Sequence, residues 1–192
     1  VADISHELRT PLASLKASLE TLMGGALSDP AAAPVFLDMV TRNAMRIEVI
    51  LDDLTDLSLI ETGAVVLSIE PVRLESAVRD VMISMKARAS ARRVRMVSTV
   101  SQDMLIQGDR RRLDQILTNL LDNAIKFNRE GGQVTVSAHA EGTRIRLLVE
   151  DTGPGIPPDA LDRIFNRFFR VDRARKYEAS GSGLGLAIVK HL

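Results

Sequence analysis

The chain has 192 residues, of which 45% are hydrophobic and 26% charged, and its formal net charge is zero. This balance is typical of a globular domain and gives no sign of a nucleic-acid partner or a membrane contact. The absence of cysteine excludes disulfides, thiol catalysis and thiolate metal sites. No apolar run approaches the roughly 20 residues that a membrane-spanning helix needs.

In the first sixty residues, apolar side chains recur in steps of four and three, which predicts two amphipathic helices. The first pattern comprises Leu8, Leu12, Leu15, Leu19 and Leu22, and the second comprises Phe36, Val40, Asn43, Ile47, Ile50, Leu54 and Leu57. Glycines end both patterns, at 24–25 and at 63, so we expect an antiparallel hairpin. Asn43 is a polar residue in the second pattern, where it either fixes the helix register or is merely tolerated.

A single helical hairpin cannot enclose a sizeable core, whereas two hairpins form a four-helix bundle. The pattern therefore predicts a homodimer through residues 1–62. The alternative is a hairpin that packs on the second domain of its own chain.

The segment Ser5-His6-Glu7-Leu8-Arg9-Thr10-Pro11-Leu12 opens the first helix. His6 falls outside the heptad pattern, so its side chain is expected to point outward. Thr10 follows His6 by four residues and Glu7 by three, which places the three side chains on one helix face. Taken alone, the segment is better explained as a surface histidine among charged neighbours.

Residues 63–192 alternate between strand and helix patterns, which predicts an α+β layer. Strands are expected at Val65–Glu70, Val94–Val100, Leu105–Ile106, Gln133–Ala138 and Arg144–Glu150. Helices are expected at Pro71–Ser90, from the N-cap Asp109 to Ile125, at Ala160–Phe169 and from Gly183 onward, with a charged loop between the last two. The chain has no G-x-x-x-x-G-K-[ST] sequence, so a nucleotide site here would not be a P-loop.

Five short motifs follow one another: S-H-E-L-R-T-P-L at 5–12, N-L-L-D-N-A-I-K-F at 119–127, D-T-G-P-G-I at 151–156, F-N-R-F-F-R at 165–170 and G-S-G-L-G-L at 181–186. In this order they closely resemble the phosphoacceptor, N, G1, F and G2 boxes of the sensor histidine kinases of two-component signalling. The resemblance covers nearly the whole chain. It implies a dimeric four-helix bundle from residues 1–62, followed in 63–192 by a two-layer α+β ATP-binding domain of the histidine-kinase and Hsp90-like type. Family members usually continue with two further strands, so we expect an unpaired sheet edge.

The resemblance also implies an ATP and Mg²⁺ site. By their match, Asn123 would coordinate Mg²⁺ with help from Asn119, Lys126 would neutralise phosphate charge, and Asp151 would accept a hydrogen bond from the adenine amine. Arg170 would reach the γ-phosphate. The further ATP-binding residues are Phe127, Gly153, Gly155 and Ile156, together with a lid root of Gly181, Ser182, Gly183, Leu184 and Gly185.

The implied chemistry is autophosphorylation of His6 with Glu7 as general base, followed by transfer to an aspartate on the receiver domain of a response regulator. Glu7 and Thr10 also resemble the pair with which bifunctional members dephosphorylate the regulator, Thr10 orienting the water. Three alternatives remain: a related ATPase or chaperone-like protein, a degenerate kinase that serves as a dimeric scaffold, and a member that acts mainly as a phosphatase. The chain is expected to be the cytosolic fragment of a membrane-bound sensor.

Overall fold

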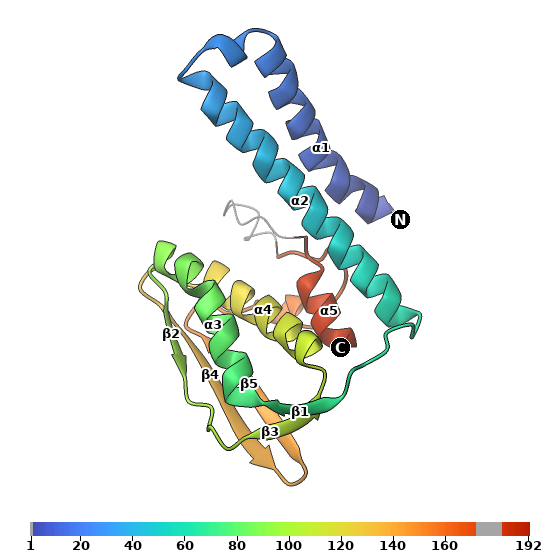
Figure 1. Cartoon of the computed structure of the whole chain (residues 1–192), viewed down its shortest axis with the longest axis vertical. Coiled ribbons are helices and arrows are strands. Elements are labelled where there is room, and N and C mark those ends of the chain that lie inside the picture. Colours follow the sequence, from blue (N-terminus) through green and yellow to red (C-terminus); the bar gives the residue numbers. More distant parts are fainter. Residues whose placement is uncertain (1, 172–181) are drawn as a thin grey trace.

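The computed structural model describes residues 2–171 and 182–192 and consists of a long helical hairpin above a mixed α/β part (Figure 1). The hairpin comprises α1 (Ala2–Met23), the short 3₁₀ helix η1 (Ala26–Ser28) and α2 (Ala32–Glu61). The predicted antiparallel pair of helices is therefore confirmed. Within the described residues, no helix combines the length and the apolar character that crossing a membrane requires.

Few side chains of the hairpin are fully covered, namely Pro11, Ser18 and Leu22 on α1 and Ile50 and Leu57 on α2. Leu12 and Leu19 of the predicted heptad pattern instead face outward, with exposed fractions of 56% and 40%. Only part of each apolar face is thus used between α1 and α2.

Asn43 forms a direct link across the hairpin. Its side-chain amide donates hydrogen bonds to Ser14 Oγ at 3.2 Å and to the carbonyl of Met39 at 2.7 Å. Of the two roles that the sequence left open for Asn43, this contact supports a fixed register between the helices.

The α/β part contains one three-stranded sheet and one two-stranded ribbon. Its elements are β1 (Glu70–Arg73), α3 (Leu74–Ala91), β2 (Arg95–Ser98), β3 (Leu105–Gly108), α4 (Arg110–Lys126), β4 (Gln133–Glu141), β5 (Arg144–Asp151), the 3₁₀ helix η2 (Pro158–Ala160) and α5 (Gly185–His191). In the three-stranded sheet, β4 is central and pairs parallel to β2 and antiparallel to β5. The separate two-stranded ribbon consists of β1 antiparallel to β3. Helices α3 and α4 cover one face of the sheet, and α5 lies between α4 and α2 (Figure 1).

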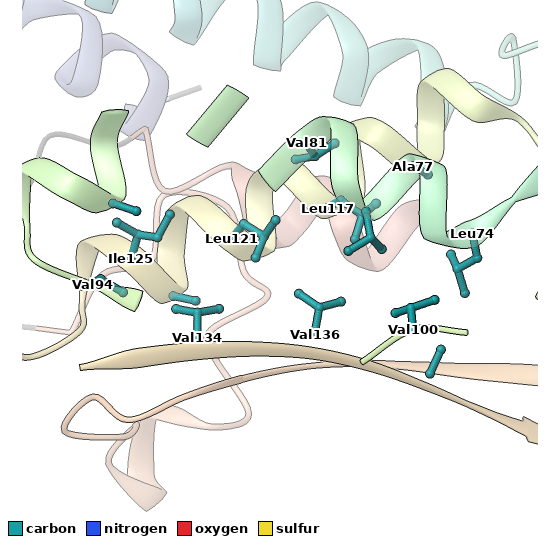
Figure 2. Close-up of a cluster of buried hydrophobic side chains, with 14 of the residues drawn as sticks. Leu74, Ala77, Val81, Val94, Val100, Leu117, Leu121, Ile125, Val134 and Val136 are labelled. Carbon is teal, nitrogen blue, oxygen red and sulfur yellow. The ribbon is translucent and has the colours of Figure 1, made fainter. Parts of the chain in front are cut away.

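The main core lies between α4 and the sheet. Figure 2 shows Val134 and Val136 of β4 pointing towards Leu117, Leu121 and Ile125 of α4. The helical residues recur every four positions and the strand residues every second position, so each element presents one apolar face. Asp109 caps the start of α4, because its carboxylate accepts a hydrogen bond from the backbone N–H of Arg112 at 3.2 Å.

The predicted strand at 65–70 is wrong, because regular pairing begins only at Glu70. Residues 64–69 have no regular structure, and the backbone N–H of Ser68 donates to the carboxylate of Asp109 rather than to a neighbouring strand. Pro71, predicted as the start of the next helix, lies inside the ribbon strand β1, and the helix begins at Leu74. Proline is tolerated there because β1 pairs with β3 alone.

The predicted helix at 160–169 is also wrong: only the 3₁₀ helix η2 forms, followed by turns. Phe168 has a positive φ of 60°, and its N–H donates to the carbonyl of Gly183 at 2.9 Å instead of to a residue one turn back. A long-range backbone contact therefore replaces the local helical one. The final helix begins at Gly185, two residues later than expected.

Candidate ATP and phosphoacceptor site

The phosphoacceptor segment lies within α1, which runs without interruption through Pro11. His6 and Thr10 are exposed, whereas Glu7 is half-buried. The Thr10 hydroxyl donates to the backbone carbonyl of His6 at 3.4 Å, so both residues lie on one helix face as predicted. The carboxylate of Glu7 pairs with the guanidinium of Arg46 on α2, at 3.7 Å.

Asn119 and Asn123 are half-buried and one turn apart on α4. Within the described residues, neither side-chain amide is assigned a hydrogen bond, so both oxygens are available to a ligand. Mg²⁺ prefers hard oxygen ligands and completes its shell with water and substrate phosphates, which two neutral amides accommodate. Among the described residues, no cluster of three or more His, Cys, Asp or Glu side chains offers a competing metal site.

The first residue of α5, Gly185, packs directly on Asn119. A Cβ on Gly185 would lie 3.1 Å from Oδ1 of Asn119. The glycine therefore lets the start of α5 approach the amide closely. The structure thus brings Gly185, near the end of the described chain, against Asn119 of α4.

Lys126 ends α4 beside the two asparagines. Burial lowers its pKa to about 8, with further lowering by the nearby charges of Arg170, Arg46 and Arg88 against an opposing effect of Asp122. Its ammonium also lies 4.8 Å from the centre of the Phe127 ring. A cation that is partly desolvated among other cations favours a bound anion.

Asp151 stands at the end of β5, where one carboxylate oxygen accepts a hydrogen bond from the N–H of Gly153 at 2.7 Å. This bond fixes the carboxylate and leaves its second oxygen for a ligand. A Cβ on Gly153 would lie 2.7 Å from Asp151 Oδ1 and 2.8 Å from the carbonyl of Phe127, so no other residue fits without a shift. Gly155 has a φ of 72°, a conformation that L residues rarely adopt.

Asn128 and Thr152 support this corner, and sequence analysis missed both. The Thr152 hydroxyl donates to Oδ1 of Asn128 at 3.1 Å, and it accepts from the N–H of Gln133 at 2.9 Å. Asn128 in turn donates to the carbonyl of Gln133 at 3.1 Å. These bonds tie the end of α4 to the end of β5, and thus the phosphate side of the site to the base side. A local pattern could not reveal them, because the partners are up to 24 residues apart.

The lid root makes contacts that the sequence did not predict. Gly181 lies outside the described residues. The Ser182 hydroxyl donates to the carboxylate of Asp53 on α2 at 2.7 Å, and burial raises the pKa of that carboxyl. Leu184 is fully buried and packs with Leu57 of α2. Ser182 and Leu184, which the resemblance assigned to the ATP site, thus both contact α2 of the helical hairpin.

Other predicted residues are placed as follows. Gly183 has a φ of 71°, and a Cβ there would lie 2.9 Å from Cα of Phe168. Phe127 and Ile156 are exposed, at 38% and 46%, and Arg170 is half-buried. The α/β part therefore holds an accessible carboxylate, a desolvated cation and two amides that have no hydrogen bond among the described residues, and the hairpin carries an exposed histidine.

Comparison with known proteins agrees with this arrangement. Residues 1–63 match the family model of the His Kinase A (phospho-acceptor) domain, and residues 108–192 match that of the histidine kinase-, DNA gyrase B- and HSP90-like ATPase. The signal transduction histidine-protein kinase BaeS of Escherichia coli (strain K12) is 34% identical over 98% of this chain and 40% of its own length.

Two solved structures are similar over most of the chain. ShkA in complex with AMPPNP is 33% identical with a TM-score of 0.72, over 99% of this chain and 39% of its own. Histidine kinase ThkA in complex with the response regulator protein TrrA is 25% identical with a TM-score of 0.73, over 88% of this chain and 49% of its own. The fold and the order of the two domains define a phosphoacceptor hairpin joined to an ATPase domain. The chain belongs to the sensor histidine kinases, and it spans between 32% and 50% of the length of the first curated relatives that it matches.

Proposed function

We propose that this chain transfers the γ-phosphoryl group of ATP to His6 and then to an aspartate of a response-regulator receiver domain. The observation that carries the proposal is an exposed histidine on α1 in the same chain as a glycine-lined carboxylate and two unpaired amides. The matches to both family models and the ShkA complex with AMPPNP support ATP as the donor.

On this proposal, Asp151 selects adenine. Its second carboxylate oxygen accepts a hydrogen bond from the exocyclic amine, which guanine lacks at that position. Gly153 and Gly155 allow the backbone to lie against the base, with Phe127 and Ile156 as exposed apolar neighbours.

Asn123, assisted by Asn119, would hold Mg²⁺, which supplies charge neutralisation to the phosphates when it is bound. Lys126 and Arg170 contribute positive charge on the same side, and Gly183 and Gly185 let the backbone at the start of α5 pack closely on Phe168 and Asn119. Gly181, Ser182 and Leu184 belong to the proposed lid root, although Ser182 and Leu184 contact α2 in this arrangement. Positioning and charge neutralisation are the main requirements of phosphoryl transfer.

His6 attacks the γ-phosphorus through one unprotonated ring nitrogen, and Glu7 accepts the proton of the other ring nitrogen. The N–P bond forms as the bond to the bridging oxygen breaks, and ADP leaves with the electron pair. The exposure of His6 permits access both to ATP and to a regulator.

In this proposal, residues 1–62 form the dimer and carry out phosphotransfer, and residues 63–192 bind ATP. Outward-facing apolar side chains on both hairpin helices favour a second copy as the partner that completes a four-helix bundle: Leu12, Leu19, Leu37, Met45, Val49 and Leu51. The complex of ThkA with TrrA supports a response regulator as the acceptor. We expect this part to work in the cytosol, attached to a membrane-bound sensor.

A direct test is incubation of the purified protein with γ-labelled ATP and Mg²⁺. We expect label on the chain that is stable in base and lost in acid, as phosphohistidine is. His6→Gln should abolish the label, while His139→Gln, an exposed histidine on β4, should keep it. Label that survives in His6→Gln would overturn the assignment.

We also propose that Glu7 and Thr10 act in dephosphorylation of the regulator, with Thr10 orienting the attacking water. Thr10 supports this role by lying beside His6 with an exposed hydroxyl. Thr10→Ala should retain autophosphorylation and lose dephosphorylation of a labelled receiver domain. Unchanged dephosphorylation by this variant would contradict the role.

A further inference from the structure

The ion pair between Glu7 and Arg46 has no place in the sequence motifs, yet it joins the two helices beside the phosphoacceptor. Both side chains are shielded from solvent, with exposed fractions of 21% for Glu7 and 28% for Arg46. Each lies four residues before a fully covered side chain, Pro11 on α1 and Ile50 on α2. The pair therefore sits at the edge of the covered part of the hairpin, where charges interact more strongly than in open water.

Glu7 and Arg46 form an ion pair that is too long to be a hydrogen bond. The distance of 3.7 Å between Arg46 Nη2 and Glu7 Oε2 exceeds the roughly 2.7–3.2 Å of an N–H···O hydrogen bond. Among the described side chains, Arg46 is the only cation that forms an ion pair with Glu7. Arg46 is thus close enough to attract the carboxylate of Glu7 without holding it in a hydrogen bond.

Arg46 also has an unused donor. Its Nε atom is buried and has no hydrogen-bond partner within the described residues. A buried, unpaired N–H is costly, so it favours the arrival of an acceptor oxygen. The charge of Arg46 also contributes to the lowered pKa of Lys126, so Arg46 lies within electrostatic range of the phosphate side of the proposed ATP site as well as of Glu7.

We infer that Arg46 is a positioning residue for autophosphorylation, which orients the Glu7 carboxylate towards His6 and then balances the charge of the phosphoryl group that His6 receives. This inference rests on the proposed function. Before transfer, the positive charge of Arg46 is matched by the Glu7 carboxylate. When Glu7 takes the ring proton it becomes neutral, and the phosphoryl group on His6 becomes the nearby anion. Arg46 exchanges one anion for the other, so that its charge stays compensated throughout the step.

The test compares autophosphorylation of Arg46→Met, which keeps the length of the side chain without its charge, with Arg46→Lys, which restores the charge. General-base catalysis contributes about 10²–10⁴ in rate, so loss of the orienting charge should lower kcat by at least about tenfold. The KM for ATP should change by less than about twofold, because Arg46 is not assigned to ATP binding, and Arg46→Lys should recover part of the rate. Arg42→Met is the matched control, since Arg42 lies one turn away on α2 and pairs only with exposed Asp38 among the described residues.

A double-mutant cycle with Glu7→Gln separates positioning from a general structural role. If Arg46 acts through Glu7, then Arg46→Met should cost much less in the Glu7→Gln background than in the wild type. Transfer from Arg46→Met protein already phosphorylated on His6 to a receiver domain should lose much less than autophosphorylation, because that step needs no proton acceptor at Glu7 and loses only the charge balance that Arg46 gives to the phosphoryl group. Circular dichroism and the dimer mass confirm that each variant is folded.

Wild-type kcat in Arg46→Met, or an equal loss in both backgrounds, would overturn the inference while leaving the proposed function intact. Absence of label on the wild-type protein would instead refute the proposed function itself. The two failures are therefore distinguishable within one set of assays.

Discussion

The helical hairpin and the α/β part differ in how completely they bury their apolar side chains. The core between α4 and the sheet is closed, with Leu117, Leu121 and Ile125 fully buried against β4. The hairpin covers only a few side chains and leaves Leu12 and Leu19 exposed. A part that buries its own core can fold alone, whereas a part with uncovered apolar faces depends on what docks against it. The α/β part thus encloses its main core, whereas the hairpin that carries His6 leaves much of its apolar surface uncovered.

The largest expected effect is on the closed core. Leu121→Ala should destabilise the α/β part by about 2–5 kcal/mol, because the truncated side chain leaves a cavity that the neighbours fill only in part. Urea denaturation followed by circular dichroism measures this loss, which should not depend on protein concentration. Ile83→Ala, at an exposed site on α3, is the control and should shift the midpoint little.

The hairpin should respond differently. Leu12→Ser removes an apolar contact that only a second copy would bury, so it should weaken the dimer by about 1.5–3 kcal/mol for each copy. Sedimentation at several concentrations measures the dimer dissociation constant. Lys16→Ser, one turn further along α1, should leave it unchanged. A Leu12→Ser variant that dimerises as tightly as the wild type would show that this face of the hairpin is covered in another way.

The contact between the two parts should be weaker still. Ser182→Ala removes the hydrogen bond to Asp53, which should loosen the docking of α5 on α2 by about 1 kcal/mol. Because the chain has no cysteine, dyes attached to cysteines introduced at Thr55 and Lys190 can report the separation by energy transfer. Ser58→Ala on α2 is the control.

The same dyes test the sign of the pH dependence. Burial raises the pKa of Asp53 in the docked arrangement, so the docked state binds the proton more tightly than an open one. Docking should therefore strengthen as pH falls towards that pKa and weaken as pH rises through it. Asp53→Asn should remove this dependence, and an unchanged pH profile in the variant would contradict the assignment.

The smallest effect concerns proton uptake at the ATP site. Lys126 has a pKa of about 8, and bound phosphates should raise it, so ATP binding near pH 8 should take up a fraction of a proton. Affinity should accordingly fall as pH rises above 8. Calorimetry in buffers of different ionisation enthalpy measures the proton uptake. Lys126→Gln should abolish this uptake. Lys86→Gln, at an exposed position on α3, is the control and should retain it.

Sequence periodicity predicted the long elements well, because α4 and β4 each repeat their apolar residues at the period of their own geometry. It failed at 65–70 and 160–169, where the backbone partners are Asp109 and Gly183, 41 and 15 positions away from Ser68 and Phe168. The motifs also named the candidate site residues, whose roles at ATP stay predictions. They did not predict Asn128 and Thr152, which tie the end of α4 to the end of β5, or Asp53, which accepts a hydrogen bond from Ser182. Each of these contacts joins elements that are distant in the chain, and no local pattern records them.

One stripe along α2 connects both parts of the molecule. Arg46, Ile50, Asp53, Leu57 and Glu61 recur every three or four residues and lie on one side of the helix. Arg46 pairs with Glu7, and Asp53 accepts a hydrogen bond from Ser182. Leu57 packs on Leu184, and Glu61 pairs with Arg167. These five positions span about 22 Å at 1.5 Å per residue. A rotation of α2 about its own axis would therefore displace the contact with Glu7 and the contacts with Ser182 and Leu184 together.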